Sequence, residues 1–289
     1  MTTSVLYDVP GPATVRRHRA ASAAAAVVLA ALAAFVLYRL AQEGQFAARV
    51  WEPFAEPGTW RAIAQGLLST IQVAVVAVAL ALVFGAVFAV ARLSDRAWIR
   101  LPAAAVVEFF RAVPLLLLIL FIFLGYGDRI GRFWSLVLGL VLYNGSVLAE
   151  IFRAGIASVP RGQAEAAYAI GLTKPQVMRL VLVPQAVRTM LPSLISQSVV
   201  ALKDSALGFV IAYSELAKTA QEIYVYYGNP LAAGVVVASI YIALCYGLSK
   251  LAVALEARQR RVRGVQGPSA AEEGAPGPSS TQPAVDERI

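Results

Sequence analysis

Six long apolar runs constrain the fold of this chain more than any other feature of its sequence. The hydrocarbon core of a bilayer is about 30 Å thick, and roughly 20 mostly apolar residues of helix cross it. Runs of this kind cover residues 20–40, 66–91, 103–124, 133–152, 191–212 and 231–255. Each must be helical, because an open strand edge would leave backbone groups unsatisfied in hydrocarbon. The sequence therefore predicts an all-α membrane protein, a polytopic bundle of about six transmembrane helices.

Composition and charge agree with a membrane protein. Hydrophobic residues make up 59% of the chain and charged residues 15%, against roughly 45–50% and 25% in a soluble domain. The net charge of +8 comes from Lys and Arg clusters between the apolar runs, which is the distribution that membrane topology requires. Membrane lipid is therefore the predicted surrounding, and no nucleic-acid partner is needed to explain the charge.

The position of the basic clusters predicts the orientation of the chain. Lys and Arg gather in the N-terminal tail, after the second and fourth runs, and after the sixth, whereas the other connections are mixed or acidic. Because short loops rich in Lys and Arg stay in the cytoplasm, both termini are predicted to be cytoplasmic.

The predicted domain boundaries follow from these runs. A cytoplasmic tail, 1–19, precedes an N-terminal helix, 20–40, and an extracytoplasmic connection, 41–65. The main membrane domain covers 66–255. A tail rich in Gly, Pro and Ser, 256–289, is typical of disorder. The first run could instead be a cleaved signal peptide, although its length exceeds the usual 7–15 apolar residues.

Residue types that carry catalysis or bind metals are scarce in this sequence. His18 is the only histidine and Cys245 the only cysteine. A Ser/His catalytic triad, a zinc site and an intrachain disulfide are therefore not expected. We predict no catalytic residues and no metal ligands in this chain.

The segment 153–188, between the fourth and fifth runs, is organised as a short helical hairpin. Pro160 is suited to open a helix over the sequence QAEAAYAI, and Gly171 to end it. Thr173 and Gln176 fit a capping box that starts a second helix, which Pro184 interrupts. A helix of about two turns is not stable alone, so the hairpin predicts a packing partner. Glu165 would favour the N-terminal end of the helix dipole and could also meet a basic side chain of that partner.

The spacing of this hairpin resembles the EAA loop of importer permeases in the ATP-binding-cassette superfamily. The matching positions are Glu165, Ala166, Ala167, Gly171 and, after V-L-V, Pro184. The resemblance implies that this short coupling helix docks in a cleft of a separate cytoplasmic ATPase dimer, which binds the ATP and Mg²⁺. The chain itself is predicted to hold no cofactor, because it has no G-x-x-x-x-G-K-[ST] loop for phosphates.

Three further strings narrow the resemblance to polar amino-acid permeases. They are FRAVPLL at 110–116, LAEIFRAGI at 148–156 and ALKDSAL at 201–207. The start of the chain, together with its extra first run, is similar to actinobacterial glutamate-uptake permeases. The resemblance implies a bacterial plasma-membrane importer of an amino acid, glutamate being the best candidate. It also implies a second permease subunit, identical or not, and an extracytoplasmic amino-acid-binding protein.

Ionisable side chains inside the apolar runs are candidates for the substrate pathway, because charge at bilayer depth is costly. Lys203 could meet a substrate carboxylate and Asp204 its ammonium group, with Ser205 at a local helix break; alternatively Lys203 and Asp204 compensate each other. Arg111 could also bind a carboxylate, or pair with Glu108 or Glu150. Asn144 and Ser146 could form hydrogen bonds between helices.

Two other classes of function compete with an ATP-driven importer. A self-sufficient, ion-coupled secondary transporter would predict broken helices in two repeated halves, and no such repeat is visible in this sequence. A membrane-embedded enzyme or receptor would need a nucleophile with its base, a metal pair or a sizeable soluble domain, and the sequence offers none of these.

Overall fold

The structure, a computed structural model, describes residues 11–263, and every regular element in that range is helical. Five of its helices are long and apolar enough to cross a membrane, which confirms the predicted polytopic helical bundle. The elements are α1 (Pro12–Gln42), α2 (Ala48–Trp51), η1 (Glu52–Ala55), α3 (Pro57–Arg92), α4 (Ala97–Ala112), α5 (Leu115–Ala157), α6 (Arg161–Ala169), α7 (Lys174–Gln176), η2 (Val177–Leu182), α8 (Val183–Asp204), η3 (Ser205–Ile211), α9 (Leu216–Tyr227) and α10 (Pro230–Arg263).

The third and fourth predicted runs meet within α5, which folds back on itself. Gly131 has φ 76° and ψ 167°, a conformation that glycine adopts without steric cost. Ile119 and Gly139 are 20 residues apart, yet a Cβ added at Gly139 would lie 2.6 Å from the Ile119 side chain. A straight helix would hold such residues about 30 Å apart. The two halves of α5 are therefore separate antiparallel helices, as the two apolar runs predict.

The third predicted run is not one continuous helix. Val113 and Pro114 have ψ near 127° and 128°, so the chain is extended between α4 and α5. Proline disfavours helical conformation in the residue before it. The helix is therefore fully broken at Pro114, which is the N-cap residue of α5.

The main core lies between α3, α5 and η3. It contains Val73 and Ala77 from α3 and Ile211 from η3, together with six side chains from α5: Leu115, Ile119, Leu136, Val137, Leu140 and Val141. Close approach of α3 and α5 depends on glycine, because a Cβ at Gly85 would lie 3.0 Å from the carbonyl oxygen of Gly145. Burial of these apolar side chains, at roughly 25 cal/mol per Å², holds the central helices together.

The fifth run lies in a longer helical path from α7 to η3. The predicted interruption at Pro184 is wrong: α8 begins at Val183 and continues through Pro184. Pro184 has no N–H to donate to the preceding turn, and the preceding segment, η2, is a π-helix, with wider turns. At Ser205 the path tightens into the 3₁₀ helix η3, which is the local break expected there.

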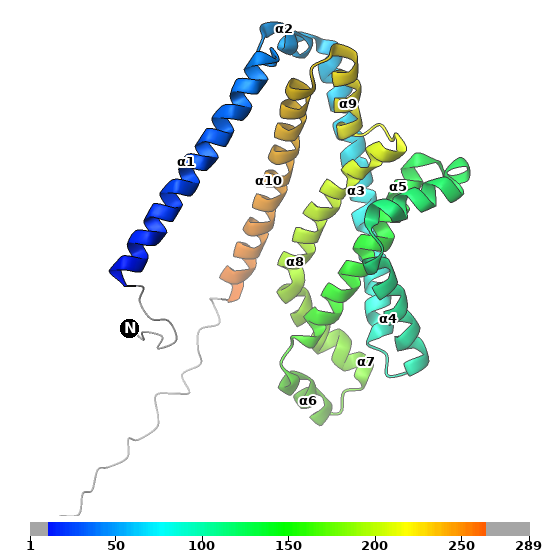
Figure 1. Cartoon of the computed structure of the whole chain (residues 1–289). Helices are drawn as coiled ribbons and strands as arrows, with labels where there is room; N and C mark the ends of the chain where they lie inside the picture. The colour runs from blue at the N-terminus through cyan, green and yellow to red at the C-terminus, as the bar shows by residue number, and fades with distance from the viewer. Residues whose placement is uncertain (1–10, 264–289) are drawn as a thin grey trace, which may run out of the picture.

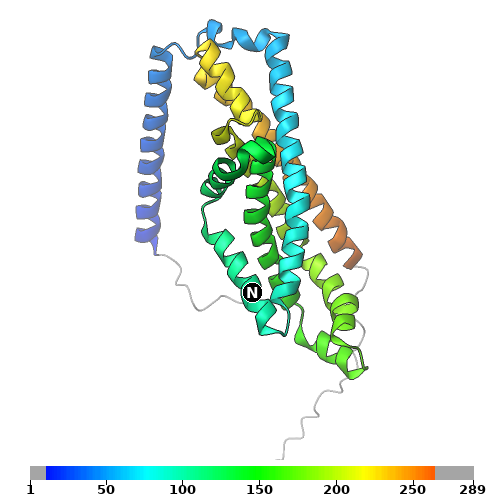
Figure 2. The same cartoon turned by 90° about the vertical axis from the view of Figure 1, so that its right-hand side faces the viewer.

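The short helices gather at two opposite ends of the molecule (Figures 1 and 2). At one end lie α6 and α7, and at the other lie α2, η1 and α9. Helix α1 stands apart from the other long helices in both views, and none of its most apolar stretch is buried.

Several predicted boundaries need correction. Helix α3 begins at Pro57, well before residue 66, because Pro57 and Glu56 form a helix start outside the apolar run. The connection 41–65 is therefore partly helical, with α2 and η1 inside it. Helix α10 continues past Leu255 to Arg263. Residues 1–10 and 264–289, which hold most of the two predicted tails, lie outside the described residues.

Candidate functional site

Helix α6 forms the exposed tip of segment 153–188. Pro160 is its N-cap residue, and Gly171 follows its end with φ 85°, so the predicted start and stop are confirmed. The predicted capping box is also present, since the backbone N–H of Thr173 donates to Gln176 Oε1 at 2.8 Å. Glu165, however, lies beyond the first turn, so its predicted role at the N-terminal end of the dipole is wrong.

The exposed side of α6 offers a small surface to a partner. Glu165, Ala166 and Gly171 are exposed, and Ile170 is 77% exposed. Ala167 is only 4% exposed, because α6 packs on η2 through this side. Of the four matching positions in and just after α6, Glu165, Ala166 and Gly171 are therefore accessible to a docking partner, whereas Ala167 holds α6 to its own chain.

Polar contacts hold segment 153–188 together and connect it to the α3–α4 connection. Lys174 Nζ lies 2.5 Å from Asp95 Oδ1, in the connection between α3 and α4. Gln185 Nε2 of α8 donates to Gln163 Oε1 of α6 at 3.3 Å. These contacts join the hairpin to α8 and to the connection between α3 and α4, so a displacement of α6 acts on more than its covalent neighbours.

A cluster of ion pairs lies where segment 153–188 leaves α5. Glu150 accepts from Arg92 Nη1 of α3 at 2.8 Å and from Arg153 Nη2 at 2.5 Å. Arg92 also lies 4.0 Å from Glu108 of α4. Arg111, in the last turn of α4, has no carboxylate within 4 Å in the described part of the chain. The two glutamates that we considered as partners of Arg111 are thus paired with other arginines.

Lys203 and Asp204 face different helices. Asp204 Oδ2 accepts from Asn144 Nδ2 of α5 at 3.4 Å, and Asn144 Oδ1 accepts from Gln197 Nε2 at 2.7 Å. The interhelical hydrogen bonds expected of Asn144 are therefore confirmed, whereas Ser146 donates to Leu142 of its own helix. No ion pair joins Lys203 to Asp204 within residues 11–263.

Ser205, the residue of the expected break, and Gly208 are both buried in packing contacts. Ser205 Oγ donates to the carbonyl oxygen of Leu202 at 2.6 Å. A Cβ at Gly208 would lie 2.6 Å from Leu136 Cδ2. The break therefore brings η3 against α5 instead of lining an open cavity.

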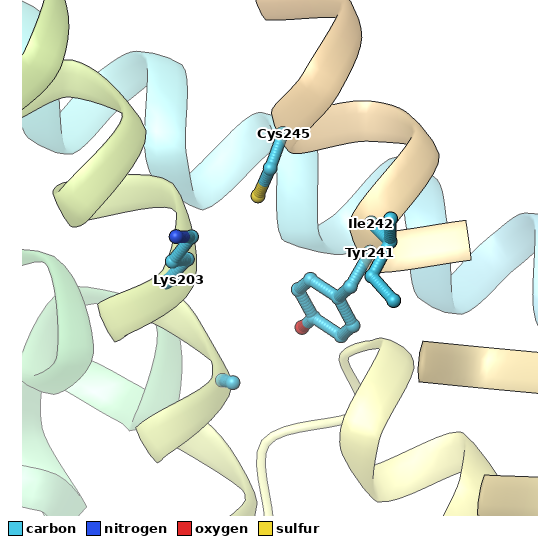
Figure 3. Close-up of a pocket in the computed structure, with 5 residues that line it drawn as sticks. Lys203, Tyr241, Ile242 and Cys245 are labelled. Carbon is cyan, nitrogen blue, oxygen red and sulfur yellow. The ribbon is translucent and has the colours of Figure 1, made fainter. Parts of the chain in front are cut away.

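Lys203 lines a pocket of about 440 Å³ between α8 and α10. The other lining residues are Ala206, Tyr241, Ile242 and Cys245. Figure 3 shows Lys203 on one side, with Tyr241 and Cys245 of α10 opposite. Of these residues only Lys203 carries a full charge at neutral pH. An ammonium group in a mostly apolar hollow at membrane depth is suited to a small ligand that carries a carboxylate.

Glu215 lies behind the pocket and is fully buried. Its carboxylate accepts from Tyr241 Oη at 2.9 Å and caps α9 by accepting from the backbone N–H groups of Ala217 and Lys218 at 2.8 and 2.7 Å. Burial raises the pKa of Glu215, and the two backbone hydrogen bonds oppose that shift.

Arg111 and Ser205 are not brought together with Lys203 in this pocket, whereas Tyr241 and Cys245 are. Sequence reasoning missed Tyr241, because a tyrosine in an apolar run carries no signal of its own. Within residues 11–263, no group of three His, Cys, Asp or Glu side chains is arranged to hold a metal ion.

Residues 81–261 match the protein family described as "Binding-protein-dependent transport system inner membrane component". The chain is 43% identical over 231 residues to the glutamate transport system permease protein GluD of Corynebacterium glutamicum, covering 78% of this chain and 85% of that protein. It is 34% identical over 204 residues to the probable glutamine ABC transporter permease protein GlnP of Bacillus subtilis, covering 67% and 92%.

Solved structures show the same arrangement of helices. One, described as an amino acid ABC transporter with histidines, superposes with a TM-score of 0.65 at 32% identity, covering 68% of this chain and 94% of that one. The inward-facing MetNI methionine ABC transporter gives a TM-score of 0.61 at 20% identity, which supports the fold alone.

Proposed function

Since the chain belongs to the family of binding-protein-dependent transport system inner membrane components, we propose that it is the permease subunit of an ATP-driven amino-acid importer. The proposed cargo is glutamate, because GluD, a glutamate permease protein by name, shares 43% of its residues over most of both chains. The chain is a multi-pass transport subunit, and the proposed location is the bacterial plasma membrane with both termini cytoplasmic.

The proposed assembly contains other chains that supply what this one lacks. A cytoplasmic ATPase dimer would bind ATP and Mg²⁺ and hydrolyse the nucleotide. A second permease subunit would complete the pathway, and an extracytoplasmic binding protein would deliver the amino acid.

The exposed surface of α6 is the proposed docking site for the ATPase. Glu165, Ala166 and Gly171 are its accessible residues, and Ala167 and Pro184 shape the hairpin behind it. The single observation that carries this proposal is the position of α6 at one tip of the molecule (Figure 1). The contacts of α6 with η2 and α8, and that of α7 with the α3–α4 connection, would pass a push from the ATPase to the membrane helices.

The proposed substrate pathway passes the pocket between α8 and α10. Lys203 would meet a carboxylate there, and Asp204, on the neighbouring side of α8, would attract the ammonium group as it passes. Arg111 is exposed at the end of α4 and would meet the substrate at a different point of the pathway. Ser205 is proposed only as a support of the helix break, since its hydroxyl is bonded to Leu202.

Reconstitution with and without the ATPase tests the main proposal. The complete assembly in proteoliposomes should take up glutamate only when ATP is supplied to the ATPase. Uptake that continues without the ATPase would favour the self-sufficient secondary transporter instead.

Gly171→Asp tests the docking surface. Gly171 has φ 85°, a conformation that costs a residue with a side chain roughly 1 kcal/mol or more, so the substitution should displace the end of α6. We expect ATP hydrolysis to continue while glutamate uptake falls at least about tenfold, a loss of coupling worth roughly 1.4 kcal/mol.

Gly58→Asp is the matched control for that variant. Gly58 lies at the opposite end of the molecule, in the first turn of α3, and a Cβ there meets nothing within 4 Å. It should leave coupling unchanged. Full coupling in Gly171→Asp, measured as glutamate transported per ATP hydrolysed, would contradict the docking proposal.

A further inference from the structure

Tyr241 connects the pocket with the buried carboxylate behind it. Its side chain lines the hollow opposite Lys203 (Figure 3), and its hydroxyl donates to Glu215 Oε2 at 2.9 Å. Because the hydroxyl already donates its hydrogen to Glu215, Tyr241 offers a ligand no hydrogen-bond donor, and it lines the pocket with its aromatic ring. A ring of this kind packs well against methylene groups, while Lys203 offers the charge.

Glu215 is a fixed acceptor for this hydrogen bond. Its two oxygens also accept from the backbone N–H groups of Ala217 and Lys218, and a buried carboxylate is tolerated only when it is bonded in this way. No cation lies within 4 Å of it among the described residues. Rotation of Glu215 away from Tyr241 would therefore break the cap of α9.

Helix α9 is in turn held on α3. The backbone N–H of Leu216 donates to Thr70 Oγ1 at 3.1 Å. A Cβ at Gly66 would lie 2.4 Å from Thr219 Oγ1, so the two helices approach as closely as their backbones allow. The position of the Tyr241 ring is thus fixed through α9 to the long helix α3.

We propose that Tyr241 is a positioning residue for the transported amino acid, with its ring held by Glu215 as the wall that faces Lys203. The pocket would take a small zwitterion, with a carboxylate against Lys203 and methylene groups against the ring. The inference rests on the proposed function, because it treats the pocket as part of the transport pathway. It adds that α9, at the end of the molecule opposite α6, sets the shape of that pocket.

The chain contains its own probe for this proposal. Cys245 is the only cysteine in all 289 residues, and it lines the same pocket as Lys203 and Tyr241. In the assembled transporter, with cysteine-free partner subunits, the rate of Cys245 labelling by N-ethylmaleimide reports access to the pocket. Slower labelling in the presence of glutamate reports occupancy. Neither readout needs transport.

Tyr241→Phe removes the hydrogen bond and keeps the ring. We expect Cys245 to react several-fold faster in this variant and the protection by glutamate to be lost. Glu215→Ala should raise the labelling rate at least as much, because it also removes the cap of α9. Adding Tyr241→Phe to Glu215→Ala should change nothing further, because the hydrogen bond between the two residues is already absent. Glu215→Gln, which keeps an acceptor oxygen, should restore slow labelling and protection.

Tyr246→Phe is the control, since Tyr246 lies on the same helix and is 62% exposed. Cys245 in this variant should be labelled at the same rate as in the unaltered chain, with the same protection by glutamate. If Tyr241→Phe leaves both the labelling rate and the protection unchanged, the proposal is wrong, and it is equally wrong if glutamate gives no protection in the unaltered chain. Failure of ATP-driven glutamate uptake in the unaltered assembly would instead contradict the proposed function.

Discussion

Lys203 and Asp204 are adjacent in sequence but face different helices. Successive residues of a helix point about 100° apart, so Asp204 reaches Asn144 on α5 while Lys203 enters the pocket beside α10. A self-compensating pair would have satisfied both charges, and the structure does not form it. Among residues 11–263 no carboxylate lies within 4 Å of the Lys203 ammonium group. Charge inside a membrane span is costly, which is the physical reason to expect an anionic group of the cargo beside Lys203.

Lys203→Ala tests this role at the scale of one residue. Loss of one hydrogen bond to a charged group costs about 1.5–3 kcal/mol, so the initial rate of glutamate uptake should fall roughly 10- to 150-fold. ATPase docking should persist, because α6 is distant from Lys203 in the sequence and lies at one tip of the molecule. Lys250→Ala, which removes a cation of α10 that does not line the pocket, is the control. Unchanged uptake at normal membrane abundance would rule out the role of Lys203.

The sequence predicts some of these residues and not others, for a physical reason. Lys203, Asp204 and Asn144 stand out because polar side chains are rare in apolar runs. Tyr241 and Cys245 do not, since each is an ordinary helix residue until α10 lies beside α8. Which residues share a pocket depends on contacts between helices distant in sequence, and a single sequence does not encode those contacts in any local pattern.

At the scale of elements, the residues that start and stop helices were predicted better from the sequence than the course of a helix between its ends. Pro160, Gly171 and the capping box at Thr173 set the limits of α6 and α7 as expected, because caps act within one turn. The π-helix η2 was not predicted, and neither was the passage of α8 through Pro184. Tertiary packing decides whether a proline ends a helix or is absorbed by a wider turn.

The α3–α5 contact gives a prediction at this scale. A Cβ at Gly85 would lie 2.8 Å from Leu148 Cβ and 3.0 Å from the carbonyl oxygen of Gly145, and backbone atoms cannot move aside cheaply. Gly85→Ala should therefore destabilise the fold by about 1–3 kcal/mol and lower the melting temperature of the purified permease by about 2–4 °C per kcal/mol.

The matched control for the packing prediction lies on α10. A Cβ at Gly247 meets nothing within 4 Å, and alanine favours helix over glycine. Gly247→Ala should therefore leave the melting temperature unchanged or raise it. If both variants melt at the temperature of the unaltered chain, close α3–α5 contact at Gly85 is not important for stability.

At the scale of the whole molecule, one helix reaches both ends. Helix α3 has 36 residues, about 54 Å at 1.5 Å per residue, which exceeds the thickness of the hydrocarbon core. Its last residue, Arg92, pairs with Glu150 near segment 153–188, while Thr70 and Gly66 contact α9 towards the other end. A movement that begins at α6 could therefore reach α9, at the opposite end of the molecule, through α3 without crossing the pocket.

The orientation of the molecule decides whether this arrangement can work. The proposed docking surface requires α6 to lie on the side where ATP is available, which is also the side to which the positive-inside rule assigns its Lys and Arg residues. Green fluorescent protein fused after Ile289 should fluoresce, because it folds in the cytoplasm. Alkaline phosphatase should be active when fused after Tyr227, at the end of α9, and inactive when fused after Arg188, within α8. The reverse pattern would place α6 outside the cell, away from any ATPase, and would overturn the docking proposal even if every contact of α6 described above were correct.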